Sequence, residues 1–300
     1  MKPLPLAGQP SSPVRIVAVV VNYGTPMKAA TAARSTVEGA RRADAVVVVD
    51  NGGANADLLA TALPFARVVA TPRNLGFAGG ANVGLRAALA DGADAVLLVN
   101  SDAALAPEAL ARLAEALRAP AGIVGPALVR ARDGRLESLG LDVSPGGGRI
   151  VEVARGAPPS LAGGPPRRVA AVSGAVMLLS RAALEVTGGF DERFFLYVED
   201  VDLCLRAARA GLHTVVVPEA RARHEGAATA GRDHPARLYY TARNHLLLAQ
   251  GQGAGRGTLL AAAGRELWRA AWLAPRSGLA GVRAAAAGVL DHARGRTGAR

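Results

Sequence analysis

Residues 95–102 read Ala-Val-Leu-Leu-Val-Asn-Ser-Asp, an apolar run that turns polar within one residue. Two earlier Val-rich stretches repeat this pattern, because residues 14–21 lead into Asn22 and residues 45–49 lead into Asp50-Asn51. Apolar runs without alternation predict strands that are buried on both faces, as in a parallel sheet. The carboxyl ends of parallel strands meet at one edge of the sheet, where ligands bind. We therefore expect these polar residues to lie together around a binding site.

The segments between these strands carry helical patterns. Alternating strands and helices imply right-handed crossovers, and so an α/β fold with a Rossmann-like, mostly parallel central sheet flanked by helices. Residues 130–168 are rich in Gly, Pro and Arg, and we expect loops and a hairpin that face a substrate. The expected helices are 27–42, 57–63, 76–90, 107–118, 180–187 and 201–210. Further strands are expected at 66–70 and 213–217, a strand or strand pair at 169–179, and a helical region from 235 with a flexible break at 251–257.

The composition excludes several classes of protein. Half of the 300 residues are hydrophobic and a fifth are charged, which is not the composition of a disordered chain. Cys204 is the single cysteine, so the sequence offers neither a disulfide framework nor a cysteine-based zinc site. No uncharged apolar run reaches the ~18–20 residues of a membrane span, and the N-terminus lacks a signal-peptide pattern. We expect a soluble or peripheral protein in the cytoplasm, with a flexible leader at residues 1–13.

The positive charge is concentrated near the C-terminus. The formal net charge is +11, and residues 256–300 hold eight arginines against two acids, together with Trp268, Trp272 and Leu273. Such a segment can lie on an anionic membrane surface, for instance at the inner face of the plasma membrane. It can equally be a solvated helical end, or a helical pair packed on the rest of the protein with both tryptophans buried. The sequence leaves these alternatives open.

A metal site is one interpretation of the polar end of residues 95–102. Asp102 follows a strand and faces a cleft, where a carboxylate is a good ligand for Mg²⁺ or Mn²⁺, whose shell substrate phosphates complete. The alternative is a turn, or the N-cap of the following helix. His224 can join Asp102 as a second ligand. A lone histidine is, however, more often an ordinary surface or core residue.

Two other segments indicate nucleotide binding. Asp50, at a strand end like Asn22, can accept hydrogen bonds from a ribose hydroxyl or a base N–H, although an Asn-Gly turn explains this position equally well. Arg73, Asn74 and Asn82 belong to a Gly-rich segment that can meet phosphates or a base. The segment is neither a dinucleotide fingerprint nor a phosphate-binding P-loop.

The densest chemistry lies in residues 188–206. Five acids occur within twelve residues, beside four aromatic residues. Glu199 and Asp200 begin a helix, where the helix dipole favours ionised carboxylates, and one of them can act as general base for an acceptor hydroxyl. The alternative is helix capping. Arg206 lies four residues after Asp202, at the spacing of a helical ion pair.

The chain resembles inverting family 2 glycosyltransferases of the GT-A fold, in the rhamnosyltransferase-like branch. The resemblance covers residues 14–246 as the transferase domain and leaves 247–300 as a basic helical extension. The matching segments, in family order, are 19–23, 49–52, 73–77, 82–84, 97–102, 173–175 and 189–206, followed by Pro218, His224, Tyr239-Tyr240 and Arg243-Asn244.

The resemblance implies a role for several residues. Asp50 would bind the nucleoside, with Asn22, Arg73, Asn74 and Asn82 also at the donor nucleotide. Asp102 and His224 would hold Mn²⁺ or Mg²⁺ at the donor diphosphate, and Asp200 would be the catalytic base. Gly174, Glu199 and Arg206 would contact the acceptor or the transferred sugar. Two positions depart from the family pattern, because Asn100 replaces the first acid of the usual Asp-x-Asp and Gly53 replaces a serine.

The implied reaction is transfer of a sugar, with inversion, from dTDP-rhamnose or a UDP-hexose to a polysaccharide or lipid-linked glycan. One alternative is a sugar-phosphate nucleotidyltransferase, but residues 22–26 lack the Arg and Lys expected after the first strand. Another is a non-catalytic basic protein that binds nucleic acid or membrane. The acids of residues 191–202 would repel phosphates, so no nucleic-acid partner is expected.

Overall fold

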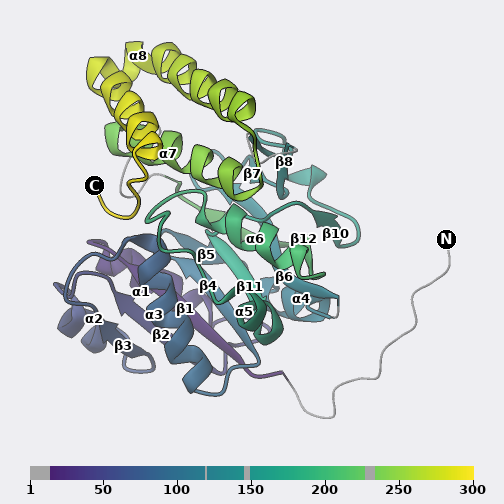
Figure 1. Cartoon of the computed structure of the whole chain (residues 1–300). Helices are drawn as coiled ribbons and strands as arrows, with labels where there is room; N and C mark the ends of the chain where they lie inside the picture. Colours follow the sequence, from purple (N-terminus) through teal and green to yellow (C-terminus); the bar gives the residue numbers. More distant parts are fainter. Residues whose placement is uncertain (1–13, 119, 145–148, 227–233) are drawn as a thin grey trace.

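The computed structural model describes residues 14–118, 120–144, 149–226 and 234–300. It has a central sheet in the strand order β10-β12-β6-β11-β4-β1-β2-β3, with helices on both faces (Figure 1). The mixed α/β architecture and the C-terminal helical region are those expected from the sequence. The expected leader, residues 1–13, lies outside the described residues.

The first half of the sheet is parallel. Its Val-rich strands pair so that Asn22 lies opposite Asp50, and Val21 lies opposite Asn100. The polar strand ends therefore meet at one edge, as the apolar runs predict. The elements of this half are β1 Ile16–Asn22, α1 Pro26–Ser35, β2 Ala45–Asp50, α2 Ala56–Ala62, β3 Arg67–Ala70, α3 Gly76–Ala90 and β4 Ala95–Asn100. The helix expected at 27–42 is shorter, because it ends at Ser35.

Burial on both faces explains why β1 lacks alternation. Val17, Val19 and Val21 face one apolar cluster, which α3 covers, whereas Ile16, Ala18 and Val20 face a second cluster, which α1 covers. Every residue of β1 is buried. Apolar packing thus covers both faces of the sheet and holds its carboxyl edge in place.

The second half of the sheet mixes directions, because β11 runs antiparallel to both β4 and β6. The expected strand 213–217 extends further, since β12 resumes after an irregularity and pairs Arg221–His224 with β6. Pro218 has no N–H to donate, so the ladder breaks there without ending. The elements are β5 Ala103–Leu105, α4 Ala109–Ala116, β6 Ala121–Arg130, β7 Leu136–Ser138, β8 Leu141–Val143, β9 Ile150–Glu152, η2 Pro159–Leu161, β10 Arg167–Val169, β11 Val176–Ser180, α5 Arg181–Thr187, α6 Glu199–Arg209 and β12 His213–His224.

Two helices form the C-terminal region, α7 Pro235–Gly251 and α8 Arg256–Ala293, at one end of the molecule (Figure 1). α8 bends at Gly278, whose φ of 64° lies in the left-handed region, and its two halves pack on α7. Gly288 permits this approach, because an added Cβ would lie 2.3 Å from the carbonyl oxygen of Tyr239.

The packing of α8 settles part of the question left by the sequence. The helical pair does pack on the protein, but Trp268 and Trp272 are 70% and 64% exposed, so the expectation that both are buried in that arrangement is wrong. The two tryptophans point to solvent because the opposite side of α8, which carries Ala262, Glu266 and Ala270, is the side buried against the protein. In the described part of the chain, no helix combines the length and apolar character that crossing a membrane requires.

Candidate active site

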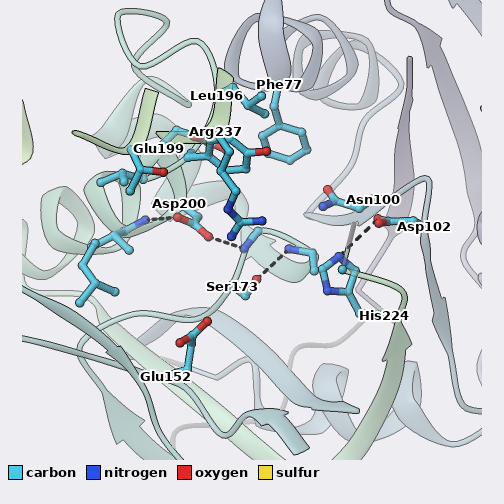
Figure 2. Close-up of a pocket in the computed structure, with 18 of the residues that line it drawn as sticks. Phe77, Asn100, Asp102, Glu152, Ser173, Leu196, Glu199, Asp200, His224 and Arg237 are labelled. Atoms are coloured by element: carbon cyan, nitrogen blue, oxygen red, sulfur yellow. Dashed lines mark hydrogen bonds and ion pairs between the residues drawn. The ribbon is translucent and has the colours of Figure 1, made fainter. Parts of the chain in front are cut away.

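A cavity of about 820 Å³ opens at the carboxyl edge of the sheet. Its lining comes from strand ends, the loop at 173–175, the segment 195–201 and residues of α7 and α8. Figure 2 shows Asp200 and Asp102 on opposite sides of this pocket, with Arg237 pointing into it. Polar lining residues include Asn51, Asn74, Asn100, Asp102, Glu137, Glu152, Glu199, Asp200, His224, Arg237, His245, Arg269 and Arg276.

Asp200 lies in the first turn of α6, with both carboxylate oxygens oriented by the backbone. Oδ2 accepts a hydrogen bond from the N–H of Gly174 at 2.7 Å, and Oδ1 accepts one from Val201 at 2.8 Å. Burial raises the pKa of Asp200, and these two hydrogen bonds oppose the rise. A carboxylate that lines a cavity, with a raised pKa and a fixed orientation, is suited to accept a proton.

Glu199 differs from its neighbour. It is buried, and its Oε2 has no hydrogen-bond partner among the described residues. Burial raises its pKa well above the usual range, and the nearby charge of Asp200 raises it further. Glu199 therefore favours the protonated form, which leaves Asp200 as the better base of the pair.

The segment before α6 has an unusual backbone. Phe195, Tyr197 and Val198 all have positive φ, between 62° and 75°, a conformation that costs free energy in residues other than glycine. Two adjacent residues of α7 hold this segment in place. Arg243 and Asn244 donate hydrogen bonds to backbone carbonyls of residues 193–197, among them Asn244 Nδ2 to Tyr197 at 2.7 Å.

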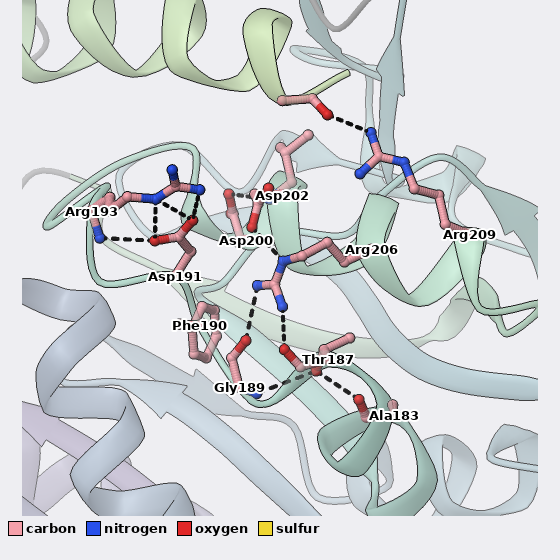
Figure 3. Close-up of polar contacts among 12 residues, drawn as sticks. Ala183, Thr187, Gly189, Phe190, Asp191, Arg193, Asp200, Asp202, Arg206 and Arg209 are labelled. Atoms are coloured by element: carbon pink, nitrogen blue, oxygen red, sulfur yellow. Dashed lines mark hydrogen bonds and ion pairs between the residues drawn. The ribbon is translucent and has the colours of Figure 1, made fainter. Parts of the chain in front are cut away.

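Arg206 joins helix α6 to the end of α5 and the turn that follows it (Figure 3). Its guanidinium forms an ion pair with Asp202 at 2.7 Å and donates to the carbonyls of Thr187 and Gly189. The ion pair is the one expected from the spacing. Arg206 is, however, absent from the cavity lining, and its guanidinium donates to acceptors within the protein.

The candidate metal ligands do lie together. Nε2 of His224 is 3.3 Å from Oδ1 of Asp102, and its Nδ1 is 2.9 Å from Oε2 of Glu137. Burial lowers the pKa of His224, but hydrogen bonds to the two carboxylates raise it more, to about 9. Figure 2 shows Asn100 beside Asp102, and the Asn100 Oδ1 is buried without a hydrogen-bond partner among the described residues.

These side chains fit a hard divalent cation. A carboxylate of Asp102 and the unsatisfied amide oxygen of Asn100 are suitable donors, and an imidazole nitrogen of His224 becomes one when a bound cation displaces its proton, with Glu137 orienting the ring from its other nitrogen. Within the described residues, no group of three or more His, Cys, Asp or Glu side chains is arranged as a complete ligand set. A cation here would therefore need oxygens from a bound ligand, as Mg²⁺ commonly does.

The expected nucleotide residues separate into two groups. Asn74 lines the cavity, as does Asn51, whose Nδ2 donates to the Asn74 Oδ1 at 3.1 Å. Asn22 and Asp50 are buried beneath it, where Nδ2 of Asn22 donates to Oδ1 of Asp50 at 2.8 Å. Tyr23, which the sequence analysis left without a role, lines the cavity and is 48% exposed, so its ring is available to stack on a base.

The other two expected nucleotide residues lie elsewhere. Arg73 is exposed and outside the cavity lining. Asn82 is buried, and its amide bonds both the N–H and the carbonyl of Phe190 as well as Glu192. Asn82 thus joins α3 to the segment before α6. Because the partners of Asn82 are distant in sequence, a local sequence pattern could not distinguish this structural role from ligand binding.

Cationic side chains from the C-terminal helices line the same cavity as the acidic residues. Arg237 of α7 lies over the ring of Tyr197 at 4.8 Å, and Arg269 and Arg276 of α8 also line the cavity. None of the three was expected at the site, because they are distant in sequence from the acidic residues. For Arg269 and Arg276 the available signal was the excess of arginine in residues 256–300.

The model of the family described as "Glycosyltransferase like family 2" matches residues 13–246. The N-acetylglucosaminyl-diphospho-decaprenol L-rhamnosyltransferase of Mycobacterium tuberculosis is 46% identical over 72 residues, which is 24% of this chain and 24% of that protein. An uncharacterized protein of Mycobacterium bovis is 31% identical over 177 residues, or 57% of this chain and 62% of that protein. The chain thus spans less than two thirds of the length of these relatives.

Solved structures share the fold. A mannosyltransferase from Pyrobaculum calidifontis, in complex with GDP-Man and Mn²⁺, has 22% identity and a TM-score of 0.58, with 98% of this chain and 81% of that chain covered. GalNAc-T7, in complex with UDP, GalNAc and Mn²⁺, has 12% identity and a TM-score of 0.56, with 78% and 48% covered. At these identities the likeness establishes the architecture and leaves the ligands to be argued from the site.

Proposed function

The chain belongs to the family described as "Glycosyltransferase like family 2", and we propose that it transfers a sugar from a nucleoside-diphosphate donor to an acceptor hydroxyl. The observation that carries the proposal is the oriented Asp200 carboxylate, which lines the same cavity as the Asp102–His224 pair. One side can accept a proton while the other receives a diphosphate. The GT-A fold of the chain is consistent with this division.

The donor would lie along the carboxyl edge of the sheet. Tyr23, Asn51 and Asn74 offer a ring and amides to the nucleoside, while Asn22 and Asp50 support this end from below. The UDP and GDP-Man in the related structures favour a nucleotide sugar. The short match to a rhamnosyltransferase favours dTDP-rhamnose, with a UDP-hexose as the second choice.

A divalent cation, Mn²⁺ or Mg²⁺, would be held by Asp102, Asn100 and His224, where it would neutralise charge on the leaving diphosphate. Arg237 points into the cavity and adds positive charge there. Such preorganised charge stabilises the leaving group without reorganisation of water.

The proposed chemical step is a single displacement with inversion. The acceptor oxygen bonds to the anomeric carbon as the bond from that carbon to the diphosphate oxygen breaks. Asp200 takes the hydroxyl proton on a carboxylate oxygen, and the hydrogen bonds from Gly174 to Oδ2 and from Val201 to Oδ1 keep the carboxylate in position. Arg243 and Asn244 contribute indirectly, because they stabilise the strained segment from which α6 begins.

The acceptor would be a polysaccharide or a lipid-linked glycan. The decaprenol diphosphate in the name of the mycobacterial relative favours the lipid-linked class. Such an acceptor would be met at the inner face of the plasma membrane.

The test is an assay of the purified protein with a panel of nucleotide sugars, with and without Mn²⁺, in the presence of a lipid-linked N-acetylglucosamine acceptor. We expect one nucleoside diphosphate to be released per sugar transferred, and a product of inverted anomeric configuration by NMR. Full activity in excess EDTA would overturn the role of the metal, and retained configuration would overturn the single displacement.

A further inference from the structure

The first half of α8 presents a continuous apolar surface to solvent. Residues about one or two helical turns apart bring four large exposed side chains to one side, Leu260 at 74%, Leu267 at 37%, Trp268 at 70% and Trp272 at 64% exposure. We call this set the apolar face, together with the small exposed residues between its large side chains, Ala261, Gly264, Ala271 and Pro275.

The packing of α8 does not need this face. The opposite side of the helix supplies the residues that contact the protein, Ala262, Glu266 and Ala270. The fold is therefore complete while two tryptophans and two leucines remain in water. A contiguous exposed apolar patch of this kind marks an interaction site in a soluble protein.

Cations border the apolar face on one side. Arg265, Arg269 and Arg276 follow at helical spacing; Arg269 forms an ion pair with the buried Glu266 at 2.7 Å, and Arg269 and Arg276 also line the active-site cavity. Tryptophan and leucine flanked by arginine is the pattern of a helix that lies in a membrane interface, because the rings enter the headgroup region while guanidinium groups meet lipid phosphates. We propose that the apolar face docks on an anionic lipid bilayer.

The charge distribution favours a bilayer over a second copy of the chain. Two copies joined through this face would bring two arginine borders together, and like charges repel. An anionic surface instead attracts each basic residue that lies near it. The chain as a whole is also cationic, with a net charge of +11.

Docking in this way would bring the cavity to the lipid surface. Trp272 belongs both to the apolar face and to the cavity lining, so the cavity extends to the edge of the docked helix. A lipid-linked acceptor could then enter without leaving the bilayer. This consequence rests on the proposed function, whereas the docking itself does not.

The chain contains its own probe of docking. Trp268 and Trp272 are its only two tryptophans and both are exposed, so tryptophan emission reports on this face alone. The full chain is mixed with vesicles of phosphatidylcholine alone or with phosphatidylglycerol, and emission and co-sedimentation are measured at low and high salt. We expect a blue shift and pelleting with the anionic vesicles, both weakened by salt.

Substitutions test whether vesicle binding depends on the apolar face or on nonspecific adhesion of the protein. Leu260→Ser combined with Trp268→Ser should lower vesicle partitioning at least about tenfold, because two inserting side chains are lost. Leu58→Ser is the matched control, since Leu58 is 49% exposed on α2, far from α8 (Figure 1). Its partitioning should equal that of the wild type. Circular dichroism checks that all variants are folded.

Three outcomes would overturn the proposal. The first is the absence of a blue shift and of pelleting with anionic vesicles. The second is equal partitioning of the wild type and the double variant. The third is a dimer in solution that dissociates in the double variant, which would assign the face to a second copy. None of these readouts requires sugar transfer, so failure of docking and failure of the proposed reaction are distinguishable.

Discussion

Asp200→Asn is the substitution that most sharply probes the proposed base. The amide keeps the size of the carboxylate but cannot accept the acceptor proton. General-base assistance contributes ~10²–10⁴-fold, which equals about 3–5 kcal/mol of barrier. We expect kcat to fall by that factor while donor affinity stays nearly unchanged.

The structure adds a cost in stability. Both oxygens of Asp200 accept a backbone N–H, from Gly174 and Val201, so an asparagine NH₂ must face one of these donors in either orientation. Losing one buried hydrogen bond costs about 1–3 kcal/mol of unfolding free energy. Urea unfolding measures this loss separately, and kinetics are compared at a temperature where the variant is fully folded.

The adjacent acid is the matched control. Glu199→Gln removes a carboxyl group that is buried and favours its protonated form, so kcat should change only a few-fold. The reasoning is refuted if folded Asp200→Asn retains kcat within about fivefold of the wild type. If Glu199→Gln is the inactive variant instead, the base is Glu199.

Three further predictions address the surroundings of Asp200. Asp102→Ala should abolish the Mn²⁺-dependent part of donor binding in calorimetry while circular dichroism still shows a folded protein, and unchanged binding would remove Asp102 from the metal site. Gly174→Ala would bring a Cβ to 3.2 Å from the Cβ of Asp200 and 3.4 Å from its Oδ2, so displacement of the carboxylate should lower kcat about tenfold in steady-state assays. Because the folded pKa of Glu199 is raised, its stabilising contribution is fully present below about pH 4.5 and is lost as pH rises through the folded value. Glu199→Gln should therefore gain stability relative to the wild type as pH rises above about 4.5, and urea stabilities of the two proteins that stay parallel with pH would contradict the burial argument.

The parallel half of the fold could be predicted because its strands are apolar on both faces. The runs ending at Asn22, Asp50 and Asn100 need no information beyond local composition, and their polar ends meet as expected. The strand β6 was missed, since Gly122, Gly125 and Pro126 resemble loop residues. In the structure Gly125 serves close packing, because an added Cβ would lie 2.7 Å from Val172.

Long-range contacts limited prediction of the site. Asn82 and Arg206 have the polar groups of ligand-binding residues, but partners outside their immediate sequence use those groups. Conversely, Arg237 and Arg276 join the cavity only because α7 and α8 fold back over it. Tyr23 follows the first strand directly, so an exposed aromatic residue at a strand end was the available signal.

The most direct test of the central claim is mass spectrometry of both products in one reaction, after the purified protein is mixed with Mn²⁺, nucleotide sugars and a lipid-diphosphate N-acetylglucosamine acceptor. The proposed function predicts an acceptor heavier by one sugar residue and an equal amount of nucleoside diphosphate, with neither formed by Asp200→Asn. The claim is contradicted if no donor of the panel yields a glycosylated acceptor, and the protein instead releases pyrophosphate from a nucleoside triphosphate and a sugar phosphate.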